Sequence, residues 1–264
     1  MASNLTVLVL GDVVGNAGCR AVVAGLPTLI KKHGADVVIV NGENAAEGFG
    51  ITEAVAADFF AAGAHVITTG NHVWHHREIF EFLDREPRVL RPANYPGGNP
   101  GTGAYVVDVR GTKVLVADLQ GRVRMRPIDC PFKKAREILK KQGSGIKLRI
   151  VDFHAESAEE KESMTLYLDG DVSLVFGTHT HVQTADERIL PKGTAYISDV
   201  GSTASVDSII GFEPDVGVRR VLTQMPLKNE VSNNKARISG IAVKLESESG
   251  KAVSITRIFE ESLV

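Results

Sequence analysis

The sequence contains little cysteine and no long hydrophobic run. Its 264 residues include two cysteines, Cys19 and Cys130. These are too few for the disulfide framework of a small secreted domain, so we expect buried free thiols. No apolar stretch approaches the ~20 residues that a membrane helix needs. The run Leu5–Leu10 is short and has no basic segment before it, so it indicates a buried strand rather than a signal peptide. We therefore expect a cytoplasmic protein that does not contact a membrane.

The sequence also lacks an excess of charge of either sign. Lys and Arg total 30, Asp and Glu total 32, and the formal net charge is −2. This balance excludes the global basic character of a protein that coats nucleic acid, and it leaves only a local basic patch open. Hydrophobic residues make up 43% and charged residues 23% of the chain, as in ordinary globular proteins. Because no repeat, low-complexity segment or linker interrupts it, we predict a single domain over residues 1–264.

Two kinds of segment alternate along the first ninety residues. Leu5–Leu10, Asp36–Val40 and His65–Thr69 are short, apolar and mostly β-branched, as expected for strands covered on both faces. Ala17–Lys32 and Thr52–Ala62 lie between them and have helix-compatible apolar spacing. This order predicts parallel strands joined by right-handed crossovers, and hence an α/β fold.

The remainder of the chain is richer in strands. A loop over 92–103 and an irregular stretch over 120–131 are indicated by turn residues. The other predicted elements are a helix at Glu78–Leu83, a hairpin of Ala104–Val109 with Lys113–Leu119, a helix at Phe132–Gln142, a strand at Lys147–Phe153, a helix from Ser157 to about Leu168, and strands at Val172–Phe176, Ala195–Ser198, Ala236–Leu245 and Ala252–Phe259.

Potential metal ligands follow the last apolar residue of five predicted strands. In open α/β sheets, ligands bind outside the carboxyl ends of the strands, so these side chains are expected at one crevice. Carboxylate, amide oxygen and imidazole together form a set suited to Mn, Fe or Zn, with no thiolate. In chain order the residues are Asp12; Glu43 and Asn44; Asn71 and His72; His154 and Glu156; and His179 and His181.

Each of these residues also has a simpler interpretation when taken alone. Asp12 fits the cap of the next helix, Asn71 fits a turn, and His154 fits a hydrogen-bonded core histidine. Their joint occurrence favours a metal site. In His179-Thr-His181, an extended segment would place both imidazoles on one side. Glycines at 11, 42, 70 and 177 precede the polar groups and allow tight turns and a close approach of the backbone.

Several other patterns receive no catalytic role. The stretch from Gly11 to Gly18 has neither the glycine spacing of a dinucleotide fingerprint nor a Walker lysine. Arg122, Arg124 and Arg126 alternate, which would place three guanidinium groups on one face of an extended segment. That face is interpreted as a solvated edge, with contact to a phosphate or a neighbouring subunit as the alternatives. The remaining histidines, His33, His65, His75 and His76, are interpreted as surface or core residues.

The ordered motifs Gly11-Asp12, Gly42-Glu43-Asn44, Gly70-Asn71-His72, His154 and Gly177-Thr-His179-Thr-His181 resemble those of the calcineurin-like metallophosphoesterases. Val14, Glu43 and Val73 depart from the general pattern, which has Asp-x-His, a bridging Asp and a Glu after Asn-His. These departures resemble the bacterial YmdB-like 2′,3′-cyclic-nucleotide phosphodiesterases, as do Asn-Gly-Glu-Asn-Ala-Ala and Thr-Ala-Tyr-Ile-Ser-Asp-Val-Gly. The resemblance runs from Leu5 to about Val218 and implies a four-layer α/β/β/α metallophosphoesterase sandwich.

The resemblance also implies a pair of transition-metal ions, Fe or Mn first and Zn as the alternative. Glu43 would bridge the two ions. Asp12, His181 and Asn44 would complete the first site, where Asn44 supplies the donor that Val14 lacks, although its amide could instead orient the substrate. Asn71, His154 and His179 would complete the second site.

The implied activity is hydrolysis of 2′,3′-cyclic nucleotides to nucleoside monophosphates. A hydroxide shared by the two metal ions would attack phosphorus, and His72 would protonate the leaving oxygen as general acid. The alternatives are a phosphomonoesterase or protein phosphatase that uses the same metals, and a nucleotide-sensing regulatory protein. We expect a small phosphoester as substrate and a homo-oligomer, and RNA binding is left open.

Overall fold

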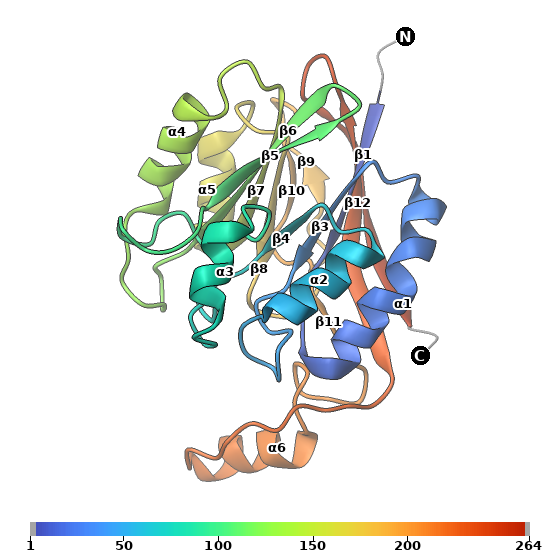
Figure 1. Cartoon of the computed structure of the whole chain (residues 1–264), viewed down its shortest axis with the longest axis vertical. Coiled ribbons are helices and arrows are strands. Elements are labelled where there is room, and N and C mark those ends of the chain that lie inside the picture. The colour runs from blue at the N-terminus through green and yellow to red at the C-terminus, as the bar shows by residue number, and fades with distance from the viewer. Residues whose placement is uncertain (1–3, 262–264) are drawn as a thin grey trace.

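The structure, a computed structural model, describes residues 4–261 and arranges them around two β-sheets (Figure 1). The first sheet runs β2 (Asp12–Val13), β11 (Ser202–Ser205), β12 (Ala236–Glu246), β1 (Asn4–Leu10), β3 (Val37–Asn41) and β4 (Val66–Thr68), and β13 (Ala252–Glu261) also pairs with β12. The second sheet runs β5 (Ala104–Val109), β6 (Thr112–Gln120), β7 (Leu148–His154), β8 (Leu174–Thr178), β10 (Ala195–Ile197) and β9 (Arg188–Ile189).

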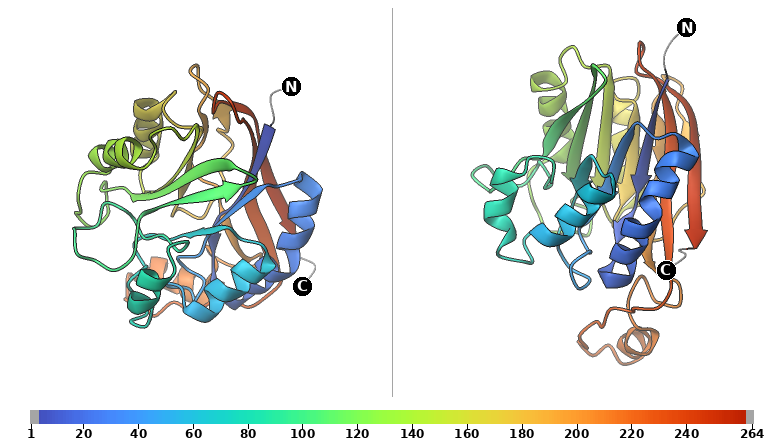
Figure 2. Two further views of the ribbon diagram at one scale, coloured as in Figure 1. Left: turned by 45° about the horizontal axis from the view of Figure 1, so that its top comes forward. Right: turned by 45° about the vertical axis from the view of Figure 1, so that its right-hand side comes forward.

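Helices cover the outer faces of both sheets. Figure 2 shows α1 and α2 against the first sheet and α4 and α5 against the second, while α6 lies apart from both sheets at one end of the molecule. The helices are α1 (Gly15–His33), α2 (Glu53–Ala62), α3 (Ile79–Arg85), α4 (Pro131–Lys141), α5 (Ala158–Leu168) and α6 (Pro214–Thr223). None of the helices within residues 4–261 combines the length and the apolar character that crossing a membrane requires.

Three hydrophobic cores separate the four layers. Because side chains alternate across a strand, β1 contributes to two of these cores. Leu8 and Leu10 pack with residues of α1 and α2, whereas Val7 and Val9 pack between the two sheets. The third core joins the second sheet to α4 and α5 and includes Phe153. The order of layers is therefore helix, sheet, sheet, helix, as the resemblance implied.

The predicted elements agree with the structure, and their ends differ by at most two residues. The first three predicted strands pair in parallel: Val9 lies opposite Ile39, and Ile39 lies opposite Val66. β5 and β6 form the predicted antiparallel hairpin. Both cysteines are free, as expected, but each is only partly buried.

Four elements were not predicted. β2 and β9 have two residues each, and β11 (Ser-Thr-Ala-Ser) contains no apolar run from which periodicity could identify it. α6 buries none of its residues and contains Gly217, which has low helix propensity. These segments depend on tertiary contacts or lie outside the packed layers, so the local sequence pattern does not predict them.

Candidate metal centre

The seven predicted ligand residues meet at one edge of the sandwich, where strands of both sheets end. Each of them contacts at least one other member of the set, so all seven form one connected cluster. The strand-end pattern therefore brings together residues that are up to 169 positions apart. The first sheet supplies Asp12, Glu43, Asn44 and Asn71, and the second supplies His154, His179 and His181.

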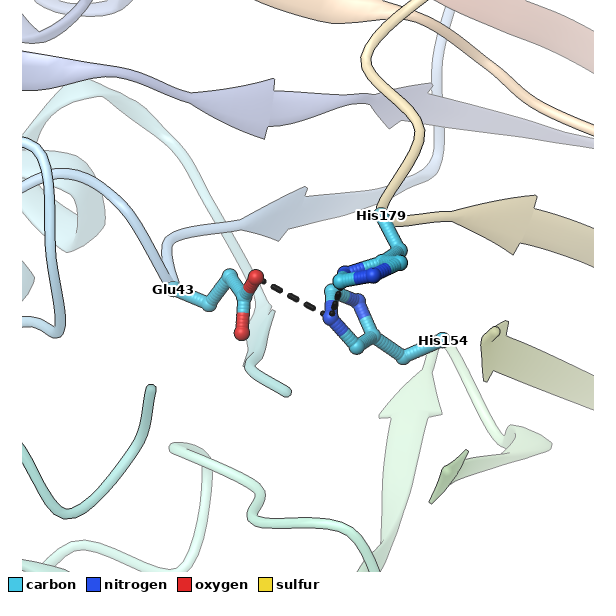
Figure 3. Close-up of side chains that lie close together, drawn as sticks. All are labelled: Glu43, His154 and His179. Carbon is cyan, nitrogen blue, oxygen red and sulfur yellow. Dashed lines mark hydrogen bonds and ion pairs between the residues drawn. The ribbon is translucent and has the colours of Figure 1, made fainter. Parts of the chain in front are cut away.

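His154 lies at the centre of one half of the cluster. It is fully buried at the end of β7, and its Nε2 lies 3.0 Å from Glu43 Oε1, from Asn71 Oδ1 and from His179 Nδ1. Figure 3 shows the Glu43 carboxylate and the two imidazole rings in close proximity. Ligand atoms of Glu43, His154 and His179 all lie within 4.8 Å of one another, a spacing that allows them to share one cation.

Asp12, Asn44 and His181 form the other half of the cluster. Asn44 Nδ2 lies 3.2 Å from Glu43 Oε1 and 3.1 Å from His181 Nε2, so it connects the two halves. Asp12 Oδ1 lies 3.9 Å from His181 Nε2 and is fully buried without a hydrogen-bond donor. Asp12 does not cap α1, since Val14 occupies that position and makes no side-chain cap. A buried carboxylate oxygen without a donor needs a positive partner.

Each of the three histidines is held by its ring nitrogen that faces away from the cluster. His154 Nδ1 lies 2.9 Å from Thr178 Oγ1, which in turn donates to Asp152, and His181 Nδ1 lies 3.1 Å from the carbonyl oxygen of Ile210. His179 Nε2 lies 3.2 Å from a carboxylate oxygen of Glu156. Such outer partners fix the tautomer and direct the other nitrogen toward a metal.

Burial and one ion pair set the charges of the cluster. Burial disfavours the ionised Glu43 carboxylate, but the charge and hydrogen bond of His154 outweigh it and lower the pKa of Glu43 to about 2. Burial likewise opposes the imidazolium of His154, yet Glu43 raises the pKa of His154 to about 8. Burial and the nearby His154 lower the pKa of His179 to about 3. His179 is therefore neutral, the form that binds a metal ion.

The predicted extended conformation of His179-Thr-His181 is wrong. β8 ends at Thr178, and both histidines adopt left-handed backbone conformations, with φ of 94° for His179 and 66° for His181. Non-glycine residues rarely adopt this region, and such strain concentrates at functional sites. The two rings do reach the same cluster, but through a tight turn rather than through strand periodicity.

Asp199 holds this turn in place. One oxygen of its buried carboxylate, Oδ2, accepts hydrogen bonds from Thr180 N (3.1 Å) and Thr180 Oγ1 (2.7 Å), and Lys161 Nζ lies 2.9 Å from the same atom. Thr180 stands between the two histidines, so Asp199 positions both of them. Sequence reasoning assigned no role to Asp199, although it occurs in a segment that carried the resemblance.

The glycines before the polar groups are required by space rather than by turn geometry. None of the four has a positive φ. A Cβ at Gly70 would lie 2.2 Å from Glu43 Oε2 and 2.4 Å from the His154 ring, and a Cβ at Gly11 would lie 1.8 Å from a carbonyl oxygen. Any larger residue at 70 would therefore displace the side chains of the cluster.

His72 borders the cluster without joining the set of close side chains. Its backbone N–H donates to Glu43 Oε2 (3.2 Å), and its ring meets Phe49 edge-on at 5.0 Å. Burial lowers the pKa of His72, and the Glu43 carboxylate opposes this shift. The half-buried ring lines a cavity together with Asn71 and His179, next to the cluster. A group that can donate a proton thus lies at the edge of the candidate centre.

The wall of the same cavity contains residues that sequence analysis did not assign to the site. They are Trp74, His75, Tyr95 and residues 124–128. The predicted alternation of Arg122, Arg124 and Arg126 on an extended segment is wrong, because the chain turns there and Arg124 has a φ of 60°. No local pattern indicates which loop of the second sheet faces the centre.

The donor set fits a pair of transition-metal ions. Three imidazoles, two carboxylates and two amides converge, the outer nitrogens of the imidazoles are tied to the protein, and one carboxylate oxygen lacks a donor. Mixed nitrogen and oxygen donors of this kind suit Fe, Mn or Zn. The chemistry of the side chains therefore supports metal binding.

Comparisons with known proteins find a matching family and a relative of similar length. The family model described as "YmdB-like protein" matches residues 8–258. A 2′,3′-cyclic-nucleotide 2′-phosphodiesterase of Bacillus subtilis (strain 168) is 44% identical over 254 residues, which cover 96% of this chain and 96% of that protein.

Solved structures share the fold. A crystal structure described as a novel phosphatase of Mycoplasma pneumoniae superimposes with a TM-score of 0.92 at 34% identity and covers 100% of this chain and 96% of that one. A putative 5′-nucleotidase of Staphylococcus aureus has a TM-score of 0.61 at 14% identity, covering 99% of this chain and 55% of that one. This last similarity concerns the fold alone.

Proposed function

This chain belongs to the YmdB-like protein family, with the calcineurin-like metallophosphoesterase fold, and we propose that it hydrolyses the P–O2′ bond of 2′,3′-cyclic nucleotides with the help of two metal ions. The observation that carries the proposal is the convergence of three imidazoles, each held by its outer nitrogen, on Glu43 and Asp12. The named activity of the Bacillus subtilis relative supports the choice of substrate.

We assign the two metal sites to the two halves of the cluster. Asn71, His154 and His179 would hold one ion, and Asp12, Asn44 and His181 the other. Glu43 would bridge them, because its Oε1 lies next to both His154 and Asn44, one from each half. When bound, paired ions of this kind activate water and neutralise the negative charge that develops on the phosphoryl oxygens.

The chain itself supplies orientation and a proton. Hydrolysis joins the oxygen of water to phosphorus and breaks the P–O2′ bond, leaving a 3′-phosphate. His72 donates its ring proton to O2′ as that bond breaks, and it regains a proton when water gives one up. Burial lowers the pKa of His72, and the Glu43 carboxylate opposes this shift.

A substrate panel tests this function. We expect protein loaded with Mn or Fe to hydrolyse adenosine 2′,3′-cyclic phosphate to the 3′-monophosphate, at a higher kcat/KM than p-nitrophenyl phosphate or a phosphopeptide. The Mycoplasma structure is described as a phosphatase, so phosphomonoester hydrolysis is the competing function. A preference for the monoesters would favour it, and binding of the cyclic nucleotide without turnover would favour a sensor.

We also propose which metals the protein binds, where in the cell it is located and how it assembles. The ligand set suits Fe or Mn, with Zn as the alternative. Two free thiols accord with a cytoplasmic location. We propose that the protein forms a homo-oligomer, and light scattering of the purified protein tests this.

A further inference from the structure

A cavity of about 550 Å³ extends from the candidate centre to a loop of the second sheet. Its lining includes Asn71 and His179, two of the proposed metal ligands, together with His72. The lining also includes residues 124–128, which follow β6. A volume of this size is in the range of small-ligand sites. The cavity is therefore large enough for more of a substrate than the reacting phosphate.

The loop that carries Arg124 and Arg126 is held at both of its ends. The buried Asn94 side chain donates to the carbonyl oxygens of Gln120 (2.8 Å) and Asp129 (2.9 Å). The Glu160 carboxylate accepts the backbone N–H groups of Arg122 and Val123. Ser157 begins α5 as predicted, and its Oγ accepts the backbone N–H of Glu160. The Glu160 carboxylate, however, binds this loop rather than the backbone N–H of Ser157. The loop is thus fixed in position beside the cavity.

The two arginines of this loop that line the cavity have no acidic partner. Among residues 4–261, the side chains of Arg124 and Arg126 make neither an ion pair nor a hydrogen bond. Arg122, by contrast, points its guanidinium at Cys130 Sγ (3.5 Å) and does not line the cavity. Arg124 also keeps a left-handed backbone conformation, which a non-glycine residue adopts at a cost. Two unpaired guanidinium groups at a cavity wall favour an anion there.

Aromatic side chains also line the cavity. The rings of Trp74 and Tyr95 are half-buried and meet edge-to-face at 5.4 Å. The Tyr95 hydroxyl donates to Gln120 Oε1 (3.3 Å), which holds the ring in place. Exposed aromatic faces in nucleotide sites commonly stack on bases. The lining of the cavity therefore combines residues of the candidate centre, aromatic side chains and two arginines.

We propose that this cavity binds a nucleotide that carries a second phosphate on its 5′ oxygen, with that phosphate on Arg124 and Arg126. The base would lie against Trp74 and Tyr95, and the 2′,3′-cyclic phosphate would lie at His72. The inference rests on the proposed function and deepens it: the preferred substrate is the 2′,3′-cyclic end of an oligoribonucleotide, or a mononucleotide with a free 5′-phosphate. A single cyclic phosphate would leave both arginines without a counter-ion.

A binding experiment tests the inference without hydrolysis. Trp74 is the only tryptophan of the chain, so its fluorescence reports occupancy of this cavity. Metal-free protein is titrated with adenosine 3′,5′-bisphosphate and with adenosine 3′-monophosphate. We expect the bisphosphate to bind about tenfold more tightly, because charge-assisted hydrogen bonds to guanidinium groups add affinity. Equal affinities would overturn the inference.

Three variants test which arginine side chains cause the preference for the bisphosphate. Arg126→Ala and Arg124→Gly should each reduce it, and the glycine also suits the positive φ of Arg124. The matched control is Arg122→Ala, which removes a guanidinium from the same loop but not from the cavity wall. The control should keep the full preference. Loss of the preference in all three variants would indicate general charge attraction and would contradict the assignment.

Turnover by the metal-loaded enzyme supplies the second test. Adenosine 2′,3′-cyclic phosphate is compared with its 5′-phosphorylated form and with the dinucleotide ApA ending in a 2′,3′-cyclic phosphate. We expect the latter two to have the lower KM, and Arg126→Ala to bring the ratios toward one. A lower KM for the dinucleotide alone would identify the 2′,3′-cyclic end of an oligoribonucleotide as the preferred substrate. Absence of any hydrolysis refutes the proposed function, and the fluorescence titration still decides the inference.

Discussion

Lys161 and Asp199 form a buried ion pair, 2.9 Å long, beneath the turn that carries His179 and His181. Both side chains are almost completely excluded from solvent, at 3% and 1% exposure. The same carboxylate oxygen accepts both hydrogen bonds of Thr180. The pair therefore connects the stability of the fold to the position of two proposed ligands.

Asp199→Ala should strongly destabilise the protein. Removing the carboxylate leaves the Lys161 ammonium buried without a partner, which costs about 3–5 kcal/mol. Urea unfolding measures the loss. The control is Lys161→Met with Asp199→Ala, which removes both charges and should recover much of the stability. A double variant that is no more stable than Asp199→Ala would show that the unpaired charge is not the cause.

Glu43→Ala should empty at least one metal site, because Glu43 is proposed to bridge both halves of the cluster. Metal analysis of the purified variant measures this directly. Glu47, on the same loop but without a contact to the cluster, provides the control variant Glu47→Ala. If Glu43→Ala retained two ions at full occupancy, the bridging assignment would be wrong.

His72→Ala should keep the metals and lose turnover by about 10²-fold or more, as expected for removal of a general acid. Metal analysis and steady-state kinetics on the cyclic nucleotide measure the two effects separately. A substrate with a good leaving group, such as a 4-nitrophenyl phosphodiester, needs less protonation and should lose less activity. Loss of both ions in this variant would contradict the role of an acid.

Gly70→Ala should impair metal binding without any change of a ligand. The added Cβ would lie 2.2 Å from Glu43 Oε2 and 2.4 Å from the His154 ring, so both side chains must move. Gly97→Ala is a matched control, since a Cβ there meets nothing within 4 Å. We expect isothermal titration with Mn²⁺ to show weaker binding for Gly70→Ala only. Equal binding by both variants would show that the cluster tolerates the displacement.

Asp118→Asn should increase stability at high pH relative to the parent protein. Burial, reinforced by the negative charge of Asp152, raises the pKa of Asp118 well above its usual value. A folded-state pKa above the unfolded-state pKa means that the native state binds more protons. Stability therefore falls as the pH rises from the unfolded-state pKa to the folded-state pKa. The amide removes this penalty. Thermal unfolding of metal-free protein at pH 5 and pH 8 measures it, and a difference in Tm that is independent of pH would contradict the shift.

Much of the fold and the convergence of the site were predictable because they depend on local periodicity and one general rule. Alternating strand and helix patterns gave the parallel strands β1, β3 and β4, and the strand-end rule placed Asp12, Glu43 and His154 at one edge. The four layers came from the family resemblance. The roles of individual ligands stay predictions until metals are measured.

The supporting residues were not predictable, because they act across elements. Glu156 followed a strand and was noted, but only the structure shows its contact with His179. Lys161 looks like an ordinary helix surface residue in sequence, and only the structure shows that it is buried and bonded to Asp199, 38 positions away. The predicted extended conformation of His179 and His181 was wrong because it continued strand periodicity past Thr178, where β8 ends.

The division of the proposed ligands between the two sheets has a mechanical consequence. Asp12, Glu43, Asn44 and Asn71 come from one sheet, and the three histidines come from the other. Bound cations would therefore cross-link the two halves of the sandwich, and a ligand that binds only the folded state adds to its stability. Chelation should accordingly lower the Tm as well as stop the reaction, so thermal stability becomes a readout of metal supply.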